Sequence, residues 1–158
     1  MSEFTEAMAQ LAAGVAVVTV RDGRDDLGVT VSALMSASAE PPMVLVSLGS
    51  GGYLAEVLLR QDLFAASLLS SGQAAVASRF ASVGRPSARH LLAGTGHHRG
   101  AHTEALVVEG GVAALELETA QVVPAGDHTL FLARVLSVDY VESSLQPLVR
   151  LRSRYRPL

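Results

Sequence analysis

Four short hydroxyl side chains stand at even positions within residues 28–48, namely Thr30, Ser32, Ser36 and Ser38. The odd positions between them are apolar, and this period of two predicts a strand with one apolar face and one hydroxyl face. A solvated strand face usually carries Lys, Arg or Glu, yet Glu40 is the sole charge between Asp26 and Glu56. We therefore expect something other than bulk water to cover these hydroxyls.

A glycine-rich segment, GSGG at residues 49–52, joins a predicted strand to a predicted helix. Backbone N–H groups at such a junction can bind an anion such as phosphate. The dinucleotide fingerprint G-x-G-x-x-G would need a third glycine where this chain has Leu54, so a Rossmann turn is excluded. The segment is therefore either a phosphate-binding turn or a plain flexible connection.

Histidines offer two further sites for chemistry. Residues 82–103 are rich in glycine, show no period and are predicted as a long loop that holds four histidines, namely His90, His97, His98 and His102. Glu104 is the only nearby acid and no rigid element is predicted there, so we expect no metal site. His128 follows Gly126 and Asp127 at the start of an apolar strand, where it is either a turn residue or a functional one.

The composition narrows the class of protein. The chain has 158 residues with 49% hydrophobic and only 17% charged side chains, against roughly 25% charged in typical soluble domains. This deficit predicts a surface buried in a partner, most simply a second copy. The absence of cysteine excludes disulfides, thiolate nucleophiles and cysteine-based metal sites. A net charge of −3 gives no broad attraction for nucleic acid, and we expect no nucleic-acid partner.

The N-terminus and the apolar runs bear on location. The first basic residue is Arg21, whereas a secretory signal begins with basic residues. No apolar run is long enough for a membrane span without polar, glycine or proline breaks. We therefore expect a cytoplasmic protein that does not enter a membrane.

The elements that must position these residues are predicted mostly as strands. A cap at Ser2 and a stop at Gly14 predict a helix between them. The capping-box spacing of Ser70 and Gln73 predicts another helix over 74–81. A third helix is predicted over residues 53–61. Strands are predicted over residues 15–20, 28–39, 43–48, 63–69, 105–109, 112–123 and 128–142.

The C-terminal tail alternates arginine with other residues, at Arg150, Arg152, Arg154 and Arg156. The alternation predicts one strand with a basic face at a sheet edge, where charge deters edge-to-edge pairing; this interpretation is favoured over nucleic-acid binding. Short strands joined by glycine turns, with only a few helices, predict a barrel-like β fold.

Five blocks of the chain, in order and in register, resemble the flavin reductases of the FMN-binding split β-barrel fold. They are GVAVVTVRDG, GVTVSALMSASAEPPMVLVSL, LFAASLLSSGQAAVASRFA, AGDHTLFLARV and PLVRLRSRYRPL. The resemblance covers the chain from about Phe4 to the C-terminus. It implies a mainly β, Greek-key-like barrel with a few short helices, and one domain over residues 1–158.

The resemblance also implies where the ligands bind. The segment from Thr30 to Ala33 is similar to the strand that lies along the flavin, the residues around Ser47 to the segment that leads to the flavin phosphate, and Ser67 stands where the family commonly has Asn. His128, in the GDH block, is implied to lie near the nicotinamide as the catalytic residue. The implied cofactor-binding residues are Thr30, Val31, Ser32, Ala33, Ser47, Leu48, Ser50, Ser67, Phe80 and Arg85.

The function that the resemblance implies is reduction of free FMN or FAD by NADH or NADPH. The reduced flavin would then diffuse to a partner monooxygenase, a transient partner, and the reductase would be a homodimer. The alternative from another class is a flavin-binding electron-transfer or sensor module of the same fold without reductase turnover.

Overall fold

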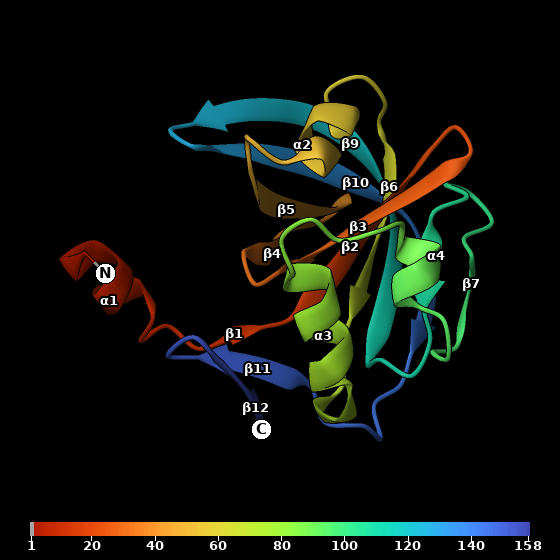
Figure 1. Cartoon of the computed structure of the whole chain (residues 1–158). Helices are drawn as coiled ribbons and strands as arrows, with labels where there is room; N and C mark the ends of the chain where they lie inside the picture. The colour runs from red at the N-terminus through yellow and green to blue at the C-terminus, as the bar shows by residue number, and fades with distance from the viewer. Residues whose placement is uncertain (1) are drawn as a thin grey trace.

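The computed structural model describes residues 2–158, and its centre is a seven-stranded antiparallel sheet in the order β3-β2-β6-β9-β10-β5-β4 (Figure 1). The strands of this sheet are β2 (Ala16–Asp22), β3 (Asp25–Val31), β4 (Leu34–Ala39), β5 (Pro42–Gly49), β6 (Leu63–Leu68), β9 (Ala113–Ala125) and β10 (His128–Val141). The mainly β architecture predicted from the sequence is confirmed. Alternation of small apolar and polar residues gives these strands their two faces.

The sheet curls into a barrel because its two edge strands are joined by a very short link. The edge strands β3 and β4 are consecutive in the chain, and only Ser32 and Ala33 separate them. Two residues cannot cross an open seven-stranded sheet, so the edges must meet. Within residues 2–158 no ladder joins β3 to β4 or β5, and the barrel is split along this line, which we call the seam. The single predicted strand over 28–39 is therefore two strands that break at the seam.

The barrel interior forms the first core. It contains inward-facing residues of β2, β5, β6 and β10, with Phe64 and Phe131 fully buried. Helix α2 (Tyr53–Leu58) covers one end of the barrel and buries Leu54, Val57 and Leu58 in the same core. The helix predicted over 53–61 is confirmed, although it ends earlier. Burial of each large apolar side chain contributes about 1.5–3 kcal/mol to stability.

A second core lies on the other face of β2. Helices α3 (Ala74–Ala81) and α4 (Ala88–Leu91) pack there, and α3 follows a 3-10 turn over Ser71–Gln73 with the predicted capping box at Ser70 and Gln73. Phe80 is fully buried in this core. It lies against Gly28, where an added Cβ would come 2.5 Å from the Phe80 ring. This close approach explains the glycine in an otherwise continuous strand.

The prediction of a structureless loop over 82–103 is wrong. This part of the chain holds α4 and a short strand, β7 (His97–Arg99), which pairs with β8 (Leu106–Val108). Side-chain contacts to distant strands order the segment in place of local periodicity. Arg99 donates two hydrogen bonds to Asp26 of β3, at 2.7 and 2.9 Å, and Arg89 lies 3.2 Å from the same carboxylate.

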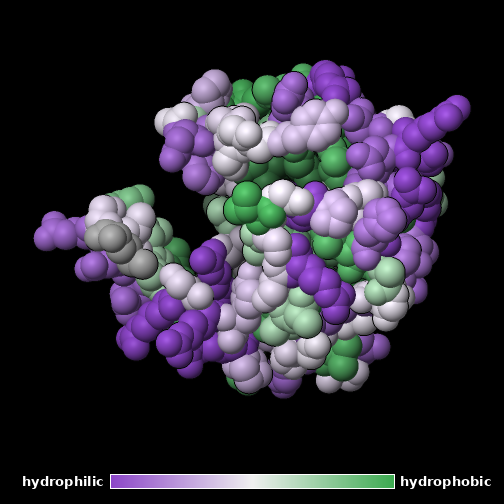
Figure 2. Space-filling view, in the orientation of Figure 1, coloured by the Kyte–Doolittle hydropathy of each residue, from purple (hydrophilic) through white to green (hydrophobic). Residues whose placement is uncertain are grey.

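The two ends of the chain meet in a third small sheet. Strand β1 (Ala13–Gly14) pairs with β11 (Leu148–Leu151), which pairs with β12 (Arg154–Pro157). The predicted single C-terminal strand is therefore a hairpin that turns at Arg152 and Ser153, and Gly14 belongs to a strand rather than to a helix stop. Helix α1 (Glu3–Met8) ends early and buries none of its residues. It stands off from the barrel as an arm (Figures 1 and 2).

None of the helices formed within residues 2–158 is long and apolar enough to cross a membrane.

Candidate functional site

The end of β5 and the start of β10 bring three of the predicted site residues together. Strand pairing sets Leu130 opposite Ser47 and His128 opposite Gly49, so Ser47 and His128 lie on the same outward face. The backbone N–H of Ser50 donates to the Asp127 carbonyl at 2.9 Å. The Ser50 hydroxyl lies 2.9 Å from that of Thr129. Ser47, Ser50 and His128 are thus neighbours, although His128 is 78 residues from Ser50 in the chain.

The seam adds two more residues to this group. The Ser47 N–H donates to the Ala33 carbonyl at 2.9 Å, which carries the β4–β5 ladder on to the two-residue link. Ser32 and Ala33 therefore adjoin Ser47. We call the five residues that meet here the seam strip: Ser32, Ala33, Ser47, Ser50 and His128.

Several polar groups at the seam strip have no hydrogen-bond partner in residues 2–158. The hydroxyls of Ser32 and Ser47 are partly exposed, and neither forms a hydrogen bond with any residue in 2–158. The Gly51 N–H in the neighbouring turn also has no partner within those residues. Hydroxyls and backbone N–H groups of this kind are the donors that a ligand with carbonyl, ring-nitrogen and phosphate groups requires. The residues present fit a flavin mononucleotide moiety.

His128 has a fixed ring and a free nitrogen. Its Nδ1 lies 2.8 Å from a carboxylate oxygen of Asp127. A carboxylate can only accept, so Nδ1 donates and Nε2 is left for a ligand. The hydrogen bond from His128 lowers the pKa of Asp127 below its ordinary value. Because 49% of the His128 side chain is exposed, it can contact a second ligand that enters from solvent.

Three predicted residues beside the seam face into the protein instead. Val31 and Leu48 are buried in the first core, at 7% and 4% exposure. The Thr30 hydroxyl donates to the carbonyl of Ala77 in α3 at 2.6 Å. Their backbones border the seam strip, but their side chains are committed to packing and to helix attachment.

Three other predicted residues lie in the second core or on its border. Phe80 is fully buried, and the buried Ser67 hydroxyl accepts a hydrogen bond from the Val108 N–H at 2.9 Å. Arg85 donates through Nε to the Gly28 carbonyl at 2.6 Å. Burial lowers the pKa of the Arg85 guanidinium. The structure does not bring these three side chains to the seam strip, and their part in cofactor binding stays a prediction.

The histidine-rich segment forms an ion-pair cluster of its own. His98 Nε2 lies 2.9 Å from Asp139, and its Nδ1 lies 3.4 Å from Glu109. The two carboxylates contact different ring nitrogens and do not converge on one point. No group of three or more metal-ligating side chains suited to a metal ion occurs in residues 2–158.

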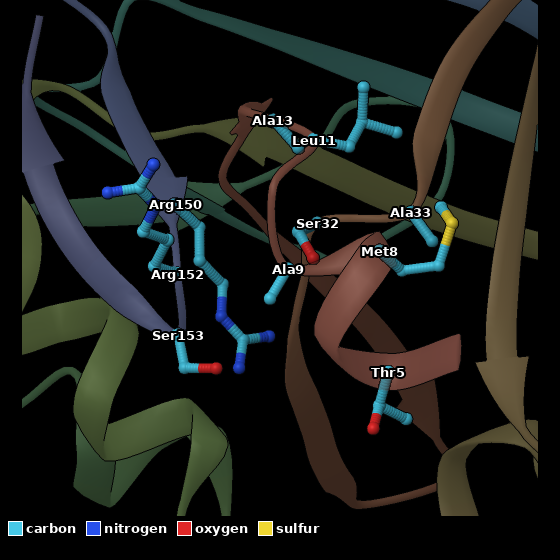
Figure 3. Close-up of a pocket in the computed structure, with 10 residues that line it drawn as sticks. All are labelled: Thr5, Met8, Ala9, Leu11, Ala13, Ser32, Ala33, Arg150, Arg152 and Ser153. Carbon is cyan, nitrogen blue, oxygen red and sulfur yellow. The ribbon is translucent and has the colours of Figure 1, made fainter. Parts of the chain in front are cut away.

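A pocket that the sequence did not predict opens beside the seam strip. It has a volume of about 370 Å³ and shares Ser32 and Ala33 with the strip. Figure 3 shows Arg150, Arg152 and Ser153 on one side of it and Met8 and Ala33 on the other, with Ser32 between. The arginine alternation was a signal for this pocket, but it was interpreted as a solvated strand face.

Comparison with known proteins shows to which family the chain belongs. The sequence profile described as "Flavin reductase like domain" matches residues 8–158. The chain belongs to the flavin reductase-like family. The resemblance found in the sequence is confirmed, and with it the flavin oxidoreductase class.

Individual relatives extend the match over nearly the whole chain. An NADH-dependent FMN reductase, AsuE2, from Streptomyces nodosus subsp. asukaensis is 40% identical over 157 residues, covering 99% of this chain and 84% of the relative. The reductase component of 4-hydroxyphenylacetate 3-monooxygenase from Thermus thermophilus is 36% identical, with coverage of 98% and 95%.

A solved structure confirms the fold. The NADH:FAD oxidoreductase SgcE6 from Streptomyces globisporus, in complex with NAD and FAD fragments, superposes with a TM-score of 0.90. It is 27% identical, and the match covers 98% of this chain and 90% of that one. The split barrel expected from the sequence is the fold that these flavin reductases share.

Proposed function

We propose that this chain is an NAD(P)H-dependent flavin reductase that reduces free FMN or FAD and releases the product to a separate monooxygenase. The whole chain, residues 1–158, would act as one flavin reductase-like domain. The observation that carries the proposal is the seam strip. The hydroxyls of Ser32 and Ser47 have no hydrogen-bond partner in residues 2–158, and Ser47 shares one outward face with His128.

This chemistry does not need a catalytic nucleophile from the protein. A bound flavin supplies the hydride acceptor and a reduced nicotinamide the donor, so the protein supplies binding and orientation. In our proposal the hydroxyls of Ser32 and Ser47 bind the polar edge of the flavin ring. The turn at Gly51 donates to its phosphate through the backbone N–H.

His128 would orient the second substrate. Its ring is held by Asp127 through Nδ1, and its Nε2 would contact the nicotinamide. Holding two reactants in a near-attack geometry removes a large part of the entropic barrier to their reaction. The small, exposed side chain of Ala33 would let the flavin ring approach the backbone closely.

Spectroscopy on the purified protein tests this function. Protein freed of flavin should oxidise NADH only when FMN or FAD is added, with many turnovers per chain. The reduced flavin should reach a monooxygenase held behind a dialysis membrane. A tightly bound flavin that NADH does not reduce would overturn the proposal and indicate an electron-transfer or sensor module.

We also propose that the functional unit is a homodimer. Phe4 is 71% exposed on α1, and α1 buries none of its residues. An isolated helix of this length is marginal in water, so it needs a surface to pack on. A second copy offers one in the outer face of the sheet, where Met35 and Val123 are exposed. Light scattering should give twice the mass of one chain, and a monomer with full activity would contradict the dimer.

A further inference from the structure

The pocket beside the seam strip has a composition that the flavin site does not explain. It lies between the α1 arm and the C-terminal hairpin, at the end of the strip marked by Ser32. Its volume of about 370 Å³ falls within the range of roughly 300–1,000 Å³ that small-molecule sites occupy. The lining residues are Thr5, Met8, Ala9, Leu11, Ala13, Ser32, Ala33, Arg150, Arg152 and Ser153. We call it the arginine pocket.

One side of the arginine pocket is basic and has no acid to balance it. Arg150 and Arg152 both line it, and none of its lining residues is Asp or Glu. Within residues 2–158 no carboxylate forms an ion pair with either arginine. Arg150 donates no side-chain hydrogen bond there, whereas Arg152 donates to Gln10 at 2.8 Å. A guanidinium left free in a pocket is suited to a phosphate, which it can bind through two parallel hydrogen bonds.

The other side of the pocket is apolar. Met8 and Leu11 are large, largely exposed side chains that α1 and its C-terminal extension hold over the opening. The Met8 thioether is flexible and makes favourable contacts with aromatic rings. A ligand with a phosphate at one end and a flat ring at the other would fill both sides.

The hairpin turn that carries these residues adopts an unusual conformation. Arg152 and Ser153 have φ angles of 51° and 61°, both in the left-handed region. Two such residues in succession form a hairpin turn in which Asn and Gly are ordinarily preferred. Backbone strain of this kind persists where surrounding contacts or a function require it. The turn fixes the α1 side of the pocket as well, because the Arg152 N–H donates to the Ala9 carbonyl at 2.8 Å.

We propose that the arginine pocket binds the adenosine-phosphate arm of a dinucleotide substrate, the group that NADH and FAD share. Arg150 contacts the phosphates, and the side of Met8 and Leu11 contacts the adenine. This inference rests on the proposed function, because the pocket adjoins the strip where the reacting rings would lie. It assigns a separate role to residues outside that strip.

A matched pair of variants tests the proposal. Arg150→Gln removes the free guanidinium, and Arg156→Gln makes the same charge change on the opposite face of the hairpin, since Arg156 pairs with Val149 and Arg150 with Tyr155. Both side chains are exposed, so unchanged thermal unfolding is expected for both variants. Calorimetric titration with ADP, in the absence of flavin, should show binding to the wild type and to Arg156→Gln. Arg150→Gln should weaken it about tenfold, the loss expected for one charge-assisted contact.

Steady-state kinetics identify which dinucleotide supplies the arm. With FMN as acceptor, Arg150→Gln should raise KM for NADH about tenfold and leave KM for reduced nicotinamide mononucleotide unchanged, if the arm belongs to NADH. With the mononucleotide as donor, it should raise KM for FAD and spare FMN, if the arm belongs to the flavin. Either pattern supports the pocket.

Failure of the pocket and failure of the function give different results. Equal ADP affinity and equal KM values in wild type and Arg150→Gln would overturn the pocket while leaving flavin reduction intact. ADP binding that depends on Arg150, in a protein that never oxidises NADH, would overturn the function and leave the pocket standing. A wild type that does not bind ADP at all also overturns the pocket.

Discussion

The seam strip and the segment over 82–103 differ in whether their polar groups have hydrogen-bond partners within the protein. Against the segment, the carboxylate of Glu116 in β9 accepts hydrogen bonds from the backbone N–H groups of His102 and Thr103, from the Thr103 hydroxyl and from Ser137, at 2.8 to 3.0 Å. In the strip, the hydroxyls of Ser32 and Ser47 have no partner in residues 2–158. Saturated polar groups fix a structure, whereas groups left free beside a pocket are available to a ligand.

The comparison extends to charge. Asp26 is buried, with 2% of its side chain exposed, and two arginines of the segment neutralise it. Arg150, at the arginine pocket, pairs with no carboxylate in residues 2–158. Arginine is therefore ion-paired in the segment and has no carboxylate partner from residues 2–158 at the pocket. Variants in the segment should change stability, whereas variants at the strip or the pocket should change activity.

The largest expected effect on stability comes from Glu116→Ala. It leaves the buried N–H groups around Thr103 without an acceptor, and we expect a loss of roughly 3 kcal/mol, with the melting temperature lowered by several degrees. The fraction that remains folded should reduce flavin at the normal rate. Glu118→Ala is the control, because its ion pair with Arg134 is exposed and is worth under about 1 kcal/mol. Equal losses in the two variants, measured by urea unfolding, would contradict the contrast.

The largest expected effect on activity comes from His128→Ala. Misplacing a donor by about 1 Å can cost on the order of 100-fold in rate, so we expect hydride transfer to slow at least tenfold. Stopped-flow loss of oxidised flavin absorbance measures this. His90→Ala, at an exposed histidine of α4, should leave the rate unchanged. A lowered melting temperature with normal transfer would show that His128 only supports its turn.

The two hydroxyls that flank Val31 should respond differently. Ser32→Ala should weaken flavin binding by about 1 kcal/mol and leave the melting temperature unchanged, because its hydroxyl bonds to no other group in residues 2–158. Thr30→Val should lower stability by about 1 kcal/mol and spare flavin affinity, because its hydroxyl attaches α3 through Ala77. Fluorescence titration and thermal unfolding distinguish them. If both variants lose flavin affinity equally, the strip extends into β3.

The smallest expected effect is a pH dependence at His98. Burial alone would lower its pKa, but the hydrogen bonds to Asp139 and Glu109 raise the pKa above its ordinary value. The folded state therefore favours the protonated ring. Its contribution is complete below the ordinary pKa of about 6.5 and is lost as pH rises through the raised pKa. Because the ring is partly exposed, the contribution should stay under about 1 kcal/mol.

Unfolding of wild type and His98→Ala in urea at about pH 5.5 and about pH 8.5 measures this contribution. The difference in stability between the two proteins should be larger at the lower pH. A difference that does not change with pH would show that the cluster contributes through packing alone.

Local sequence patterns predicted the parts of the fold that local physics determines. The period of two predicted extended structure over β3 and β4, the spacing of Ser70 and Gln73 located the start of α3, and five blocks in register pointed to the family. The pattern could not separate Thr30 from Ser32, because the difference lies in the Ala77 carbonyl, 47 residues away. The period of two also continues through Ser32 and Ala33, so it did not predict the break between β3 and β4.

Two predictions from the sequence were wrong because they concern segments that local patterns do not determine. The segment over 82–103 reads as a loop because its order comes from Asp26 and Glu116, which lie far away in the chain. The C-terminal hairpin was missed because Arg152 and Ser153 occupy a turn that sequence rules reserve for Gly and Asn. Of the predicted site residues, the structure gathers those on exposed strand ends and leaves the buried ones apart.

The two-residue link at the seam joins binding to the local opening of the barrel. No ladder connects β3 to β5 in the described chain, so the seam is held by the Ser47–Ala33 hydrogen bond and by packing. Such a line opens at lower free energy than the interior of the sheet, and its amides exchange with solvent first. In our proposal, a flavin that contacts Ser32 and Ser47 stabilises the closed seam, by about 2.7 kcal/mol at a concentration of 100 times Kd, and so slows amide exchange along it.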